Sequence, residues 1–261
     1  MIFITIFQYF WPNKQILAIP LKKFKIQRLL LLFFGVFLNI SNIHSQSSNK
    51  TAVYNWFDKT INNESLPINN GKLHTNFDKI IGTSDRYYNS DKFISGSLGY
   101  SEQEYFDVQL KYDIYKDELI LKSPGEGMIE INLIKENIQY FKLYDKRFFN
   151  LTIDKPVVLN VRGGFYEENL IGKNFIFYIK HYKEKKEILK GSEFFIDYYY
   201  KNEFILFTEG KYTVINAKNE LLKLFPNEKN KINDYYLMNR NLRKENEVRF
   251  MENLMRYINN I

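Results

Sequence analysis

The stretch EYFDVQLKYDIYKDELILKS, residues 104–123, decides the fold class, because apolar and polar side chains alternate along its first half. Successive side chains of a β-strand point to opposite faces, so this period of two predicts a half-buried strand. One face carries Phe106, Val108, Leu110, Tyr112 and Ile114. The other face carries Asp107, Gln109, Lys111, Asp113 and Tyr115. Lys116-Asp117-Glu118 then predicts a turn, and residues 119–122 predict the returning strand of a hairpin.

The chain after this hairpin also predicts a series of short strands joined by turns. Turn residues separate further apolar runs at 128–134, 137–144, 157–161, 165–170, 175–182, 194–200, 204–207 and 212–215. The charged run KEKKE at 183–187 predicts a loop or a hairpin tip, and Lys201-Asn202 predicts a turn. About ten short strands at this spacing predict an antiparallel β-sandwich or an open barrel.

The period becomes helical from Asn216 onward. Asn216 can cap a helix over 217–225, and a second helix is predicted from Asn227 to Met238. A third, from about residue 243, has one apolar stripe made of Val248, Met251, Leu254, Met255 and Ile258. Strands followed by helices predict an α+β protein. We expect a polar N-terminal segment (46–91), a β-rich body (92–216) and C-terminal helices packed on that body (217–261).

The N-terminal part has the features of an export signal. Residues 21–46, LKKFKIQRLLLLFFGVFLNISNIHSQ, contain basic residues, an apolar run over 29–40 and a small polar exit. This run is shorter than the ~20 residues of a membrane-spanning helix and fits the ~7–15 residues of a secretory signal. Cleavage after Ser45 would leave Gln46 as the first residue, and the true start is expected at Leu21. A buried core helix and an uncleaved anchor are the alternatives.

Charge and composition narrow the function classes. The net charge of +7 comes mostly from residues 1–46, which hold five Lys and Arg and no acidic residue. The remainder carries 32 basic against 30 acidic residues, which is too balanced for typical nucleic-acid binding. The chain contains no cysteine, so disulfides, a thiolate nucleophile and a lipoprotein anchor are excluded.

Motifs for catalysis or cofactor binding are weak throughout. SGSLG at 95–99 lacks the first glycine of a nucleophile elbow around Ser97, and PGEGMIE has Glu130 where a dinucleotide motif has its third glycine. There is no paired-histidine motif, so neither a metal site nor a cofactor is predicted. His181 is expected to be an exposed strand residue, and His74 to lie in an irregular segment before the sheet.

Paired carboxylates are the remaining route to hydrolysis, since glycosidases need only two of them. The candidate pairs are Asp113 with Asp117, Glu102 with Glu104, and Glu167 with Glu168. The two aspartates flank one hairpin tip, where Asp commonly stabilises turns. Adjacent strand residues such as Glu167 and Glu168 point to opposite faces. No pair is therefore expected to converge, and surface charge is the simpler interpretation.

Three blocks, taken in order, resemble a known group of proteins. They are GSLGYSEQEYFDVQLKYDIYKDELIL (96–121), GGFYEENLIGKNFIFYIKHYK (163–183) and NAKNELLKLFPNEKNKI (216–232). In these blocks the chain is similar to uncharacterised exported β-rich proteins of the Bacteroidetes type. The resemblance spans about 70–261 and implies export and a β-rich fold. It carries over no catalytic or binding residue, and the first 20 residues have no counterpart in it.

Together these features predict an exported envelope protein, periplasmic or associated with the outer membrane. Its expected role is that of a non-catalytic binding or structural module, whose partner is an envelope protein or a small ligand. We expect no nucleic-acid partner, no cofactor and no transmembrane helix in the mature chain. An outer-membrane-associated β-barrel component and a cryptic carboxylate hydrolase are the alternatives.

Overall fold

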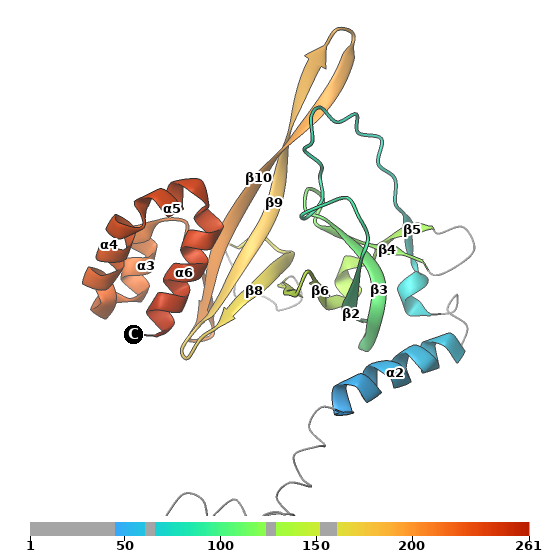
Figure 1. The fold of residues 1–261 in the computed structure, drawn as a ribbon, viewed down its shortest axis with the longest axis horizontal. Helices are drawn as coiled ribbons and strands as arrows, with labels where there is room; N and C mark the ends of the chain where they lie inside the picture. The colour runs from blue at the N-terminus through green and yellow to red at the C-terminus, as the bar shows by residue number, and fades with distance from the viewer. Residues whose placement is uncertain (1–44, 61–65, 124–128, 152–160, 261) are drawn as a thin grey trace, which may run out of the picture. The chain divides into compact units, whose positions relative to one another are not determined.

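The computed structural model describes residues 45–60, 66–123, 129–151 and 161–260 (Figure 1). The apolar run at 29–40 and the turn at 124–127 lie outside the described residues, as does most of the predicted strand at 157–161. Ser45 and Gln46, which form the expected cleavage site, are the first residues of helix α2 (Ser45–Thr60).

Eleven strands of the described chain form one antiparallel sheet that is not closed. Their order is β1-β5-β4-β3-β2-β6-β7-β8-β9-β10-β11. The strands are β1 (Gly71–Leu73), β2 (Ile94–Tyr100), β3 (Gln103–Asp113), β4 (Glu118–Lys122), β5 (Glu130–Leu133), β6 (Ile138–Leu143), β7 (Lys146–Asn150), β8 (Phe165–Ile171), β9 (Ile176–Lys190), β10 (Glu193–Thr208) and β11 (Lys211–Val214). The predicted β-rich, antiparallel body followed by C-terminal helices is confirmed.

Strand β3 differs from the predicted alternation at one point. Its register with β2 shifts between Gly96 and Leu98, and Asp107 has a positive φ of 56°, so an extra residue bulges there. The bulge puts Tyr105 into the core and leaves Phe106 half-buried against Tyr54 of α2, with ring centroids 5.7 Å apart. The prediction that Phe106 continues the buried face was therefore wrong.

The second face of β3 is covered as well. Lys111 and Asp113 are buried because the segment before β2 crosses this face. In that crossing, Tyr88 N donates to Tyr112 O at 2.8 Å, and Arg86 Nε lies 2.6 Å from Asp113 Oδ2. The alternation along 104–115 thus predicts the strand correctly, but its polar face is covered and not open to solvent.

The C-terminal helices pack beside the end of the sheet formed by β8, β9 and β10 (Figure 1). They are α3 (Lys218–Leu224), α4 (Lys229–Met238), α5 (Arg240–Glu245) and α6 (Glu247–Asn259). Helix α3 starts one residue later than predicted: Ala217 is its N-cap, and the Glu220 carboxylate accepts the Ala217 N–H at 2.8 Å. No helix in the described residues has the length and apolar character needed to cross a membrane.

The apolar stripe predicted for the last helix is largely confirmed in α6. Phe250, Met251, Leu254, Met255 and Ile258 are buried against aromatic residues of the sheet, including Phe177 and Phe204. Asn246 caps the helix, since its side chain accepts the Arg249 N–H at 2.9 Å. The helix therefore has a fixed start and a fixed rotation, which decide where its polar side chains lie.

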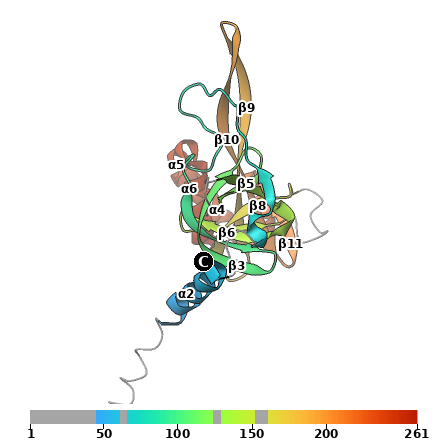
Figure 2. The ribbon, with the colours of Figure 1, turned by 90° about the vertical axis from the view of Figure 1, so that its right-hand side faces the viewer.

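Strands β9 and β10 form a long hairpin that extends past the neighbouring strands (Figures 1 and 2). The run at 183–187 lies inside β9, and Lys201-Asn202 lies inside β10, so both predicted turns were wrong. The chain reverses instead near Gly191, which has a positive φ of 66°. The segment around Ile80 lies along the outer part of β10, where Ile80 bridges to Ile196.

Candidate functional site

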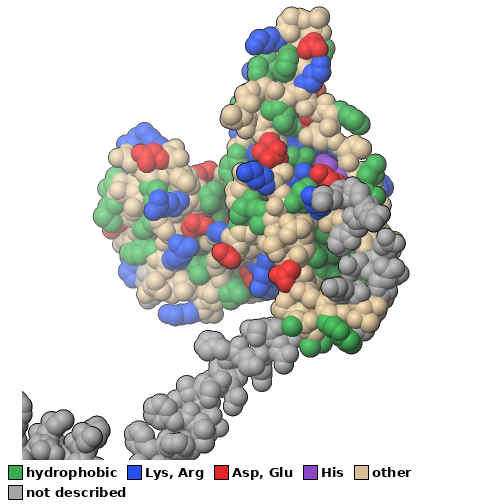
Figure 3. Space-filling model, turned by 45° about the vertical axis from the view of Figure 1, so that its right-hand side comes forward, with side chains coloured by type: hydrophobic (Ala, Val, Ile, Leu, Met, Phe, Trp, Pro, Cys, Tyr) green, Lys and Arg blue, Asp and Glu red, His purple; other side chains and the backbone are tan. Residues whose placement is uncertain are grey.

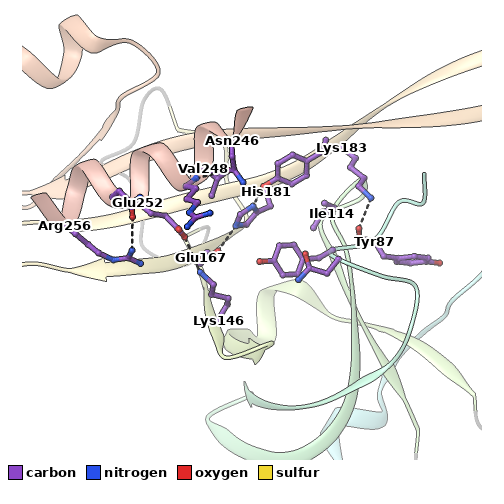
Figure 4. Close-up of a pocket in the computed structure, with 15 residues that line it drawn as sticks. Tyr87, Ile114, Lys146, Glu167, His181, Lys183, Asn246, Val248, Glu252 and Arg256 are labelled. Carbon is purple, nitrogen blue, oxygen red and sulfur yellow. Dashed lines mark hydrogen bonds and ion pairs between the residues drawn. The ribbon is translucent and has the colours of Figure 1, made fainter. Parts of the chain in front are cut away.

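A cleft of about 700 Å³ lies between the sheet and helix α6. The sheet contributes side chains of β7, β8, β9 and β10, and the crossing segment contributes Tyr87, Tyr88 and Asn89. Figure 4 shows Glu252 and Arg256 of α6 on one side, with Tyr87, Ile114 and Lys183 across from them. Figure 3 shows basic and acidic side chains intermingled on the visible face, not one patch of a single sign.

Four adjacent strands place one polar side chain each in a row across the sheet. The pairing of β8 with β9 puts Glu167 opposite Ile179, and that of β9 with β10 puts His181 opposite Asn202. Residues two apart on a strand share a face. Glu167 therefore lies diagonal to His181, and His181 lies diagonal to Tyr200. Lys146 of β7 extends the row, because its strand neighbour Phe148 pairs with Glu167.

Glu167 and His181 form the floor of the cleft. His181 Nε2 lies 2.7 Å from Glu167 Oε2, and the two side chains are 4% and 1% exposed. The other carboxylate oxygen accepts hydrogen bonds from Lys146 Nζ and Asn169 Nδ2, each at 2.7 Å. Burial alone would raise the pKa of Glu167, but the hydrogen bonds and charges of these neighbours outweigh it and lower this pKa to about 2. Glu167 is therefore an anion at neutral pH.

Tyr200 completes the row at the edge of the cleft. Its hydroxyl is hydrogen-bonded to His181 Nδ1. A carboxylate only accepts, so His181 donates its Nε2 hydrogen to Glu167, which leaves Nδ1 for the hydrogen bond with the Tyr200 hydroxyl. Burial, with the charges of Glu167 and Glu252, raises the pKa of Tyr200. The ring of Tyr88 packs against His181 with centroids 5.0 Å apart and helps to fix the imidazole.

Helix α6 closes the other side of the cleft with a polar stripe. Arg249, Glu252, Asn253 and Arg256 follow one another at intervals of three, one and three residues, so they share a helix face. Glu252 ties this face to the sheet, because its Oε1 lies 2.6 Å from Asn169 Nδ2 and 3.3 Å from Lys146 Nζ. The apolar stripe of α6 points to the core, and the polar stripe therefore faces the cleft.

The structure corrects the expectations for His181 and Glu167. His181 is not an exposed strand residue, and Glu167 is not a surface charge, because α6 and the crossing segment cover both. One signal in the sequence points to this outcome. Phe177, Ile179 and His181 fall on the same face of one strand, so the histidine continues a buried apolar row.

Asp117 does more than stabilise a turn, because it belongs to a second buried network. Its carboxylate accepts hydrogen bonds from Tyr112 Oη at 2.5 Å, from Lys180 Nζ at 2.6 Å and from Lys135 Nζ. Burial would raise the pKa of Asp117, but the two lysines lower it, and burial lowers the pKa of Lys180 to about 8. Gly164 approaches so closely that a Cβ there would lie 1.9 Å from Asp117 Oδ2. This network is part of the core.

Asp113 has a different set of contacts from Asp117, so the two do not form one site. Besides Arg86, it accepts the backbone N–H groups of Tyr115 and Lys116 at Oδ1, each at 3.0 Å. Burial, the largest contribution, raises the pKa of Asp113 despite the nearby guanidinium. Asp113 thus joins the crossing segment to β3.

The remaining candidates also have structural contacts. Glu168 lies 3.4 Å from Arg147, and Glu104 accepts from Tyr140 Oη at 2.9 Å, while Glu102 is exposed in a turn. Ser97 lies within strand β2 and not at a strand-to-helix turn. His74 is buried and contacts Asn132 and Tyr87. Of all candidates singled out in the sequence, Glu167 and His181 line the cleft, and its other lining residues were missed.

The cleft contains no recognisable metal site. Within the described ranges, no group of three or more His, Cys, Asp or Glu side chains is arranged to hold a metal ion. Comparison of the chain with protein-family models, with curated proteins and with solved structures found no match.

Proposed function

We propose that the protein is an exported binding module that holds a small anionic ligand in the cleft between α6 and strands β7–β10. The observation that carries this proposal is the pair Arg249 and Arg256. Both side chains line the cleft from one face of α6, and both residues are exposed. Among the described residues, neither guanidinium has a carboxylate within 4.0 Å, and the described side-chain bond of the pair is that from Arg256 Nη1 to Asn253 Oδ1, at 3.3 Å.

The other basic groups of the cleft are already engaged. Lys146 is paired with Glu167 and Glu252, and Lys183 donates to Asp85 and to the backbone carbonyl of Tyr87. These pairs fix the walls of the cleft, and the two lysines therefore offer little unpaired positive charge to an anionic ligand. The two arginines differ, because neither is paired with a carboxylate. Arg256 uses one N–H on Asn253, and each guanidinium still has several N–H donors for an added carboxylate or phosphate.

The aromatic residues of the cleft favour a ligand with an organic body. Tyr87 and Tyr88 of the crossing segment and Tyr200 of β10 line the cleft, and Figure 4 shows Tyr87 across from α6. A polar cleft with a few aromatic rings suits a small molecule that carries one or two anionic groups. A volume of about 700 Å³ lies within the usual range of ligand pockets.

Binding is tested by titrating citrate and, separately, inorganic phosphate into the protein in an isothermal titration calorimeter at low salt. A charge-assisted hydrogen bond contributes ~1.5–3 kcal/mol, so removing two of them with Arg249→Gln and Arg256→Gln should weaken binding by at least roughly 100-fold. Arg240→Gln is the matched control, because Arg240 is exposed on α5 and does not line the cleft. Failure of both probes to bind, or an equal loss in the control, would contradict the proposal.

Export is the second part of the proposal and rests on residues 21–46. A basic start, a short apolar run and Ser45 before Gln46 support a cleaved signal. Fractionation of cells, followed by N-terminal sequencing of the protein, tests it. A chain that starts at Gln46 in the envelope fraction supports export, and a chain that keeps residues 21–45 in the cytosol contradicts it.

A further inference from the structure

Tyr200, His181 and Glu167 form a connected row whose geometry goes beyond ligand binding. A nucleophilic side chain is recognised by a hydrogen bond to a base, with the base held in turn by a third group. Here the Tyr200 hydroxyl is hydrogen-bonded to His181 Nδ1, and His181 Nε2 lies 2.7 Å from the Glu167 carboxylate. The three side chains come from adjacent strands β10, β9 and β8, so the sheet itself sets their spacing.

We propose that Tyr200 is a nucleophile that accepts an acyl group from a carboxylic ester, with His181 as its general base and Glu167 as the residue that positions His181. The Tyr200 oxygen bonds to the ester carbonyl carbon while its proton moves to His181 Nδ1. The bond from that carbon to the leaving alkoxide then breaks, and the alkoxide takes the proton from His181. Water reverses these steps on the tyrosyl ester and releases the acid.

The surroundings of the row suit this chemistry. Lys146 and Asn169 fix the second oxygen of Glu167, which leaves the first one directed at His181. This arrangement keeps the Nε2 hydrogen on the carboxylate side and Nδ1 free to take a proton. The phenol needs such a base, because its surroundings raise the pKa of Tyr200 and make the free phenolate scarce at neutral pH.

Tyr200 is also accessible to a reagent, and the chain contains a matched control. Tyr200 is 46% exposed, and Tyr199, the preceding residue on β10, is 42% exposed. Consecutive strand residues point to opposite faces, so Tyr199 lies on the other side of the ribbon. The Tyr199 hydroxyl is hydrogen-bonded to the Asp197 carboxylate and not to a histidine, and this contact raises the pKa of Tyr199. Exposure alone therefore predicts equal reactivity of the two tyrosines, and the His181 base predicts a large difference.

The test is covalent labelling with phenylmethylsulfonyl fluoride at neutral pH and without added ligand, followed by peptide mass spectrometry. In this reaction the tyrosine oxygen bonds to sulfur, fluoride leaves, and His181 takes the proton. General-base catalysis contributes ~10²–10⁴-fold, so Tyr200 should be labelled at least about 100-fold faster than Tyr199. Equal rates for the two tyrosines in the unaltered protein would overturn the proposal, whatever the variants do.

Three variants locate the source of the reactivity. His181→Asn should bring the Tyr200 rate down to that of Tyr199, Tyr200→Phe should abolish the fast label, and Glu167→Gln should slow it by about tenfold or more. Fast labelling of Tyr200 that persists in a folded His181→Asn variant would overturn the role of the base. Citrate binding by the unaltered protein, measured in parallel, keeps a failure of this proposal distinct from a failure of anion binding.

Discussion

His181 Nε2 lies 2.7 Å from Oε2 of Glu167, and both side chains are almost completely buried between the sheet and helix α6. A buried carboxylate costs free energy unless it is hydrogen-bonded and paired. Glu167 satisfies this requirement with His181, Lys146 and Asn169. The pair is therefore both a structural element of the sheet and the floor of the cleft.

Glu167→Gln is expected to destabilise the protein. The substitution keeps the shape of the side chain but removes the charge that His181 and Lys146 contact. We expect the free energy of unfolding to fall by about 1–3 kcal/mol. This lies at the lower end of the cost of breaking a buried ion pair, because Lys146 is partly exposed. Urea unfolding followed by circular dichroism measures the change. Glu187→Gln on the exposed part of β9 is the control and should change it by less than about 0.5 kcal/mol.

The stability conferred by Glu167 should depend on pH in a defined direction. Its pKa is lowered from 4.5 to about 2, so the folded state holds the ionised form more strongly than the unfolded state does. This contribution is complete above about pH 5 and is lost as the pH falls through about 2. The difference between wild type and Glu167→Gln should therefore shrink by roughly half or more between pH 7 and pH 3. An unchanged difference would show that Glu167 titrates normally.

Gly164→Ala is expected to damage the second buried network. Gly164 has a φ of 131°, and a Cβ there would lie 1.9 Å from Asp117 Oδ2 and 2.6 Å from Lys180 Nζ. We expect a loss of more than about 2 kcal/mol, from backbone strain together with displacement of a buried ion pair. Gly191→Ala at the hairpin turn is the matched control, since nothing lies within 4 Å of its Cβ position. It should lose only about 1 kcal/mol, and equal losses would contradict the close contact.

Leu254→Ala tests whether α6 is held against the sheet. Leu254 is fully buried in the cluster that contains Phe177 and Phe250, so its truncation leaves a cavity. We expect a cost of about 2–5 kcal/mol in thermal or urea unfolding. Leu237→Ala on the exposed surface of α4 should cost less than about 0.5 kcal/mol. A cost below about 1 kcal/mol for Leu254→Ala would mean that the helix does not pack as described.

Strands and helices could be predicted where the local side-chain pattern agrees with the burial seen in the structure. The hairpin at 104–123 and the apolar stripe of α6 both follow from side-chain period alone. The long β9–β10 hairpin was missed because KEKKE reads as a solvated turn, whereas charged residues on both faces of an extended ribbon remain in water without ending the strand. Likewise, the cover over Lys111 and Asp113 depends on the chain before β2, which no local pattern reveals.

The site was less predictable than the fold. Glu167, His181 and Tyr200 are 14 and 19 residues apart and meet only through the registers of β8, β9 and β10. A single charged residue on a strand gives no sign of such a register. The arginines of α6 were on a predicted helix, but which strands their face would meet depends on how the helix docks.

The most direct test of the binding cleft is an NMR titration that follows the arginine Nε–H signals while citrate is added at low salt. The signals are assigned by single Arg→Gln substitutions at 249, 256 and 240. We expect the signals of Arg249 and Arg256 to shift together and to saturate at the same citrate concentration, while the Arg240 signal stays unchanged. Equal shifts of all three signals, or no saturating shift at Arg249 and Arg256, would contradict it.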